Sequence, residues 1–117
     1  MKPIIIAVTL VTTLALAYSG FAQAQQADHL KQAREHVNAA VMQGEKGDTK
    51  TLVQHAETAL EHVKMAQTPK PLADLAKAIK SLEAAIRQGT AGDATKATEH
   101  AKESVEYIDA ATAALGG

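Results

Sequence analysis

Apolar side chains recur at every third or fourth position along most of the chain, the spacing that gives a helix one apolar face. Beyond residue 27, four such stretches follow one another, separated by short segments rich in glycine or proline. We therefore expect helices at about 28–43, 49–66, 71–88 and 94–115. No stretch shows the strict alternation of apolar and polar residues that predicts a strand. The pattern indicates an all-α fold.

An internal repeat with an offset of 45 residues divides this pattern into two halves. The segment 43–48 recurs as 88–93, and apolar positions on both sides of it recur at the same offset. A fixed self-similarity of this length indicates a duplicated supersecondary unit. We expect each copy to be an antiparallel helical hairpin, the first at about 28–67 and the second at about 71–115.

The repeated segments have the residue types of two helices joined by a tight turn. Gly44 and Gly89 follow long helical patterns, and we expect both in the left-handed conformation that closes a helix. Asp48 and Asp93 can cap the helix that follows. A proline cluster ends at Pro71, which we expect in the first turn of the third helix. Four amphipathic helices with short loops predict an antiparallel up-down four-helix bundle.

The N-terminus has the pattern of a secretory signal peptide. Lys2 precedes an apolar run at 4–18, and Ala22-Gln23-Ala24 has the small-residue pattern of a cleavage site. We expect cleavage after Ala24, which would leave residues 25–117 as one periplasmic bundle domain with no stable membrane insertion. The alternative is a membrane anchor, for which the apolar run is short and rich in threonine.

Composition excludes several classes of function. The chain has no cysteine, which rules out disulfides, thiolate metal sites, a c-type haem and a thiol nucleophile. Its formal net charge is −1, so no basic face is indicated and nucleic acid is not an expected partner. Neither a His-Glu-x-x-His nor a Glu-x-x-His motif occurs. We expect a monomer that is not an enzyme.

The five histidines are the candidate functional residues, and four of them are spaced by seven: His29 with His36, and His55 with His62. Residues seven apart share a helix face but lie about 10 Å apart, too far for one ion. Across an antiparallel hairpin, however, level residues have a constant index sum. His36 with His55 and His29 with His62 have the same sum, so the two pairs should lie level. Both members of a pair either line the shared groove or point away from it.

Paired imidazoles suit Cu(II), Ni(II) or Zn(II), with water completing the coordination shell. The groove orientation therefore predicts two metal sites in the first repeat. The other orientation gives solvated histidines without a function. In the second repeat only His100 remains, and its level partner is Ser81. His100 is thus a weaker candidate metal ligand, which Glu103, one turn further on, could assist.

The sequence resembles the small metal-binding proteins (SmbP-like), which are histidine-rich periplasmic four-helix bundles that bind divalent metals. The resemblance covers residues 25–117. It is carried by these motifs: His29-x6-His36, the two Gly-x-x-Gly turns, Gln54-His55-Ala56-Glu57, Glu61-His62, and Glu99-His100-Ala101-Lys102-Glu103-Ser104.

The resemblance implies a small exported protein that sequesters or buffers copper, nickel or zinc. Relatives typically have histidine at six positions where this chain does not: Gln43, Asp48, Ser81, Gln88, Asp93 and Tyr107. Two hypotheses follow. The first is a metal buffer whose partners are metal ions bound by His29, His36, His55, His62 and His100. The second is a structural or interaction bundle of the same family whose metal sites are largely lost.

Overall fold

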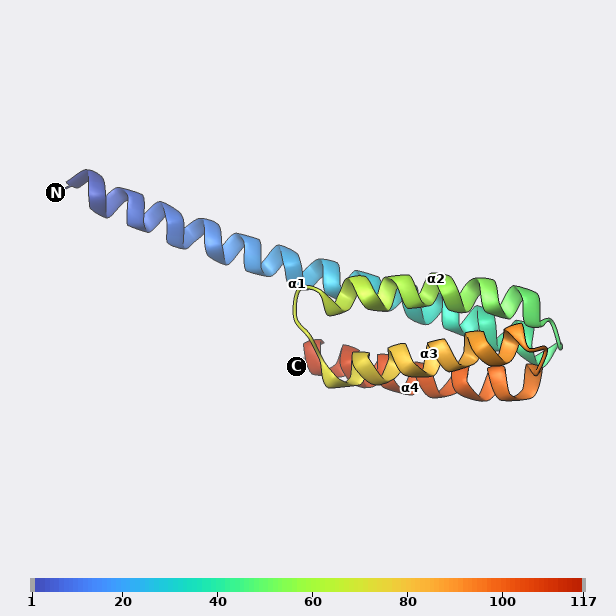
Figure 1. The fold of residues 1–117 in the computed structure, drawn as a ribbon. Helices are drawn as coiled ribbons and strands as arrows, with labels where there is room; N and C mark the ends of the chain where they lie inside the picture. The colour runs from blue at the N-terminus through green and yellow to red at the C-terminus, as the bar shows by residue number, and fades with distance from the viewer. Residues whose placement is uncertain (1, 117) are drawn as a thin grey trace.

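Four helices account for almost all of the chain (Figure 1). The computed structural model describes the backbone of residues 2–116 and the side chains of residues 20–116. The helices are α1 (Lys2–Glu45), α2 (Thr49–Gln67), α3 (Ala73–Thr90) and α4 (Ala94–Gly116). No strand occurs in the described residues, and the predicted all-α four-helix bundle is confirmed.

The helices form two hairpins, α1–α2 and α3–α4, that pack against each other along their length. Helix α1 also packs against α4 and α2 packs against α3, and α2 makes a smaller contact with α4 across the bundle. The core between them is made mostly of alanine, with one or two larger aliphatic side chains from each helix. Fully buried large residues are Leu30, Val37, Leu52, Val63, Leu75, Leu82 and Ile108. Alanine-rich faces allow close helix approach but bury little apolar area per residue.

Helix α1 is much longer than the sequence pattern predicted. It begins at Lys2 instead of near residue 28, and its N-terminal half projects beyond the end of the bundle (Figure 1). The predicted start was wrong because the alanine- and glutamine-rich segment 22–27 contains good helix formers and no breaker. Cleavage after Ala24 and export stay predictions. Within the described part of the chain, no helix is long and apolar enough to cross a membrane.

The two hairpin turns have the same geometry, with one correction to the predicted glycine roles. The left-handed residues are Gly47 (φ 82°) and Gly92 (φ 87°), whereas Gly44 and Gly89 lie inside α1 and α3. In the first turn, the Asp48 N–H donates to the Gln43 carbonyl (2.9 Å) and the Gly47 N–H to the Gly44 carbonyl (3.0 Å). This is a Schellman motif, and the second turn repeats both bonds.

Gly44 and Gly89 are needed for helix packing. A Cβ added at Gly44 would overlap Thr98 Oγ1 of α4 and lie 2.6 Å from Leu52 Cδ1 of α2. A Cβ added at Gly89 would lie 2.6 Å from Val53 Cγ2. The absence of a side chain therefore lets three helices converge at the turn end of the bundle.

The expected aspartate caps are confirmed. The Asp48 carboxylate accepts from the Thr51 N–H (3.0 Å), and the Asp93 carboxylate accepts from the Lys96 N–H (3.0 Å). The Asp48 pKa is lowered, chiefly by the bond from the Thr51 backbone. Each cap fixes where its helix begins, and with the Schellman turn it sets the register of the hairpin.

The link between the hairpins lies at the other end of the bundle. Pro71 precedes α3 and does not occupy its first turn, because the extended Leu72 is the N-cap residue and its N–H donates to Gln67 Oε1 (2.9 Å). The buried Gln26 of α1 donates through Nε2 to the Ala66 carbonyl (2.7 Å) and to the Lys70 carbonyl (2.8 Å). Gln26 thereby ties α1 to the end of α2.

Candidate metal centre

Four histidines line the groove between α1 and α2, and the structure brings together both predicted pairs. His29 Nδ1 lies 3.1 Å from His62 Nδ1, and His36 Nδ1 lies 3.3 Å from His55 Nδ1. The groove orientation is thus the one that the chain adopts. In a neutral pair, one ring donates an Nδ1–H and the other accepts it.

The two pairs also contact each other, which the index sums did not reveal. The His36 and His62 rings stack with centroids 5.9 Å apart and an interplanar angle of 11°. The rings within each pair are tilted, with centroids 5.4 Å apart for His29 and His62 and 5.6 Å apart for His36 and His55. The four rings form a continuous series, His29–His62–His36–His55, which we call the histidine array.

The array favours neutral imidazole at its centre. The pKa of His62 is lowered from its usual value, first by partial burial and then by the nearby His29 and His36. The carboxylates Glu61 and Asp28 oppose this shift. A lowered pKa keeps His62 unprotonated at neutral pH, and the unprotonated ring is the form that ligates a metal.

The spacing of the nitrogens fits one divalent ion per pair. An ion about 2.0–2.1 Å from both nitrogens subtends an angle of about 100° between nitrogens 3.1 Å apart, and about 107° between nitrogens 3.3 Å apart. These angles lie between the right angle of a square-planar site and the tetrahedral value, the geometries of Cu(II) or Ni(II) and of Zn(II).

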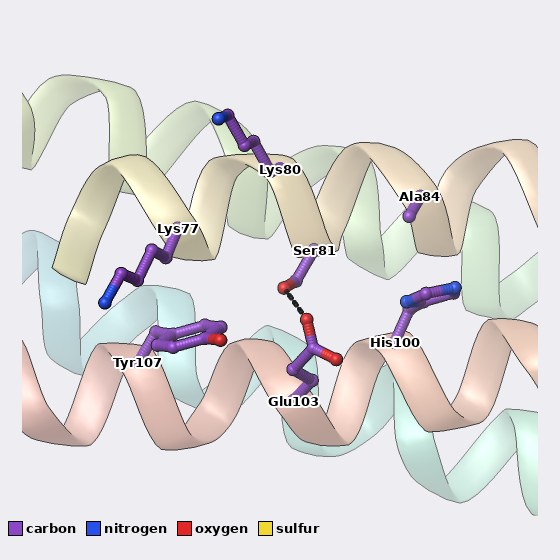
Figure 2. Close-up of a pocket in the computed structure, with 7 residues that line it drawn as sticks. All are labelled: Lys77, Lys80, Ser81, Ala84, His100, Glu103 and Tyr107. Atoms are coloured by element: carbon purple, nitrogen blue, oxygen red, sulfur yellow. Dashed lines mark hydrogen bonds between the residues drawn. The ribbon is translucent and has the colours of Figure 1, made fainter. Parts of the chain in front are cut away.

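His100 lies in the groove between α3 and α4, which differs from the histidine array in chemistry. Figure 2 shows His100 on one wall with Glu103 and Tyr107, facing Lys77 and Ser81. Ser81 donates to Glu103 Oε1 (2.6 Å), so the level partner of His100 is bonded to another residue. The groove encloses about 280 Å³.

No group of three or more histidine, cysteine, aspartate or glutamate side chains among the described residues could hold one ion together. Each pair of the array offers two imidazole nitrogens, so an ion held by one pair would keep further coordination positions for water. His100 and Glu103 line one groove, but the hydrogen bond to Ser81 occupies one carboxylate oxygen of Glu103.

The sequence pattern did not predict two features of these grooves. The first is the His36–His62 stack, because these residues are not level and meet only through the directions of their rings. The second is that Lys77 and Lys80 line the groove of His100. The repeat could have revealed this difference in charge, because at the 45-residue offset Lys77 and Lys80 align with Gln32 and Glu35 of the first repeat.

A four-helix bundle with paired imidazoles in a groove is, as a class, suited to carrying metal ions. The chain matches the model of a family described as small metal-binding protein over residues 1–111, and it belongs to that family. The resemblance seen in the sequence is thereby confirmed, and the protein is a small metal-binding protein whose family description names no reaction. No curated protein matches the chain.

Proposed function

We propose that this protein sequesters or buffers divalent copper, nickel or zinc in the periplasm, and that the histidine array is the binding site. The observation that carries the proposal is the convergence of two Nδ1 atoms in each pair, at 3.1 Å and 3.3 Å. For an ion to bind both nitrogens of a pair, the proton on the donating Nδ1 would move to Nε2 of the same ring, so that both rings ligate as neutral imidazoles.

The array has the properties of an exchangeable site. Its four rings are partly exposed on the bundle surface, so an ion can enter and leave without opening the core. Each pair supplies only two protein ligands, and water completes the shell. Moderate affinity and fast exchange suit a buffer better than a structural metal site.

A second candidate function, a structural or interaction bundle, is favoured by the second repeat. Three of the four array positions are replaced there, by Asp74, Ser81 and Tyr107. Under this second function the first repeat has also lost metal binding, although it keeps its histidines. Its imidazoles would then bind no ion at neutral pH, and the helix surface would bind a partner instead.

Calorimetric titration of the purified protein with Cu(II), Ni(II) and Zn(II) at pH 7.5 separates the two candidates. The buffer function predicts uptake of about two ions by the array. His100→Ala should change the stoichiometry little, because its groove offers no second imidazole. Absence of uptake by the wild type would leave the interaction bundle as the function.

The proposed location has its own test. Because Ala22-Gln23-Ala24 has the pattern of a cleavage site, intact-mass measurement on protein from the periplasmic fraction should identify Gln25 as the first residue. Full-length chain in the membrane fraction would contradict export with cleavage.

A further inference from the structure

The two histidine pairs are not isolated from each other. His62 contacts its partner His29 and stacks on His36, which in turn contacts His55. The pairs are separated by seven residues on each helix, or about 10 Å along the bundle axis. Ions held by the two pairs would therefore be close enough to interact electrostatically.

We infer that the histidine array binds two divalent cations with negative coupling, so that an ion in one pair weakens binding of the second ion in the other. This inference rests on the proposed function of the array. It adds that the protein releases metal in two steps of different affinity. The salt concentration sets the ratio between the affinities of the two steps.

Charge repulsion sets the size and sign of the coupling. Two dications about 10 Å apart repel each other through water, and mobile ions screen this repulsion with a Debye length of about 30 Å at 0.01 M salt and about 8 Å at 0.15 M. The second ion should then bind roughly sevenfold more weakly than the first at 0.01 M, and only about twofold more weakly at 0.15 M, beyond the statistical factor.

The side chains around the array offset part of this charge. Glu61 and Asp28 lie near enough to His62 to act on its pKa. Both are exposed, so solvent screens them, and they are present whether one or both pairs are loaded. They strengthen both binding steps and leave the difference between the steps in place.

Two variants measure each pair by itself in the intact chain. His29→Ala removes the His29–His62 pair and leaves the His36–His55 pair. His55→Ala removes the His36–His55 pair and leaves the His29–His62 pair. Both variants keep the stack of His36 on His62. Titration with Ni(II) alone, at 0.01 M and 0.15 M of a non-coordinating salt, gives the intrinsic affinity of each remaining pair. We expect one ion per variant.

The coupling between the two ions is then obtained by comparing the wild-type titration with the affinities of the two variants. The inference predicts that the second wild-type binding step is weaker than either intrinsic affinity, by roughly sevenfold at 0.01 M salt, and that the gap closes to about twofold at 0.15 M. A wild-type isotherm equal to the sum of the two variant isotherms at both salts would overturn the inference and leave the proposed function standing. A gap that does not change with salt would also overturn it. If neither the wild type nor the variants take up Ni(II), the proposed function itself fails.

Discussion

The grooves of the two hairpins occupy equivalent places in the fold and contain different chemistry. Between α1 and α2, four imidazoles contact one another in a series. Between α3 and α4, the equivalent positions hold Asp74, Ser81, His100 and Tyr107, and Lys77 lies over the Tyr107 ring at 5.8 Å from its centroid. One groove gathers four imidazoles, and the other keeps a single imidazole beside a Ser–Glu hydrogen bond.

The difference shows which residues the scaffold needs. The turn bonds and the aspartate caps occur in both hairpins with nearly the same distances, and each hairpin has a close-packed helical glycine. The groove residues lie beside the apolar stripes, and all except the buried Ser81 are partly exposed, so most of them can change without loss of the core. The proposed metal site thus lies at four partly exposed positions of the first hairpin that core packing does not fix.

The largest effect is expected from removing one imidazole of each pair. The double variant His36→Ala and His62→Ala leaves two unpaired rings, His29 and His55. A single imidazole holds a divalent ion poorly, so each site should weaken at least about tenfold, which corresponds to 1.4 kcal/mol. Calorimetric titration with Cu(II) or Ni(II) measures this loss.

The matched control for that experiment is His100→Ala in the other groove, which should lower total uptake little. Alanine favours helix at all these positions, and circular dichroism can verify that both variants stay folded. If His100→Ala proved to be the damaging change, the assignment of the sites to the first hairpin would be wrong.

The second effect is a gain of binding in the α3–α4 groove. Ser81→His would place a ring level with His100, at the position that His36 occupies in the first hairpin. The groove volume of about 280 Å³ can accept the ring, and the exposed Glu103 side chain can move aside. We expect one additional Ni(II) equivalent by titration.

Lys80→His is the matched control for this gain. Lys80 lines the same groove, but its side chain points away from His100 in Figure 2. A histidine there should add no ion. Equal uptake by both variants would show that added histidine alone, without the level pairing, accounts for the gain.

The fold could be predicted from the sequence because helical spacing, the 45-residue offset and the turn residues all agree. The level pairing of His36 with His55 also followed from hairpin geometry, since it depends only on residue number. The role of Gly44 could not be predicted, because it depends on a close approach by Thr98 of another helix. The His36–His62 stack was beyond prediction for a similar reason, since it depends on side-chain directions.

A third, smaller effect concerns packing that the two hairpins share. Gly44→Ala forces a Cβ into Thr98 and Leu52, and overpacking of this kind costs about 1–3 kcal/mol, against a gain in helix propensity of at most about 1 kcal/mol. We expect a lower free energy of unfolding by urea denaturation. Gly116→Ala, where an added Cβ meets no atom within 4 Å, is the control. A neutral Gly44→Ala would contradict the close packing described at this turn.

The smallest effect is a pH dependence of stability that only the first hairpin should show. The His62 pKa is lowered in the folded chain by burial and by His29 and His36. The unfolded chain therefore binds more protons at this residue as the pH falls through the usual value of about 6.5, and the free energy of unfolding decreases. The loss of stability continues until the pH passes below the folded pKa of His62, and above 6.5 the contribution of His62 does not change with pH.

Urea denaturation with a chelator measures the free energy of unfolding at pH 7.5 and pH 5.0. The difference between the two values should be larger for the wild type than for His62→Gln. His100→Gln should keep the wild-type difference because it leaves the array intact, and an equal flattening by both variants would place the effect outside the array.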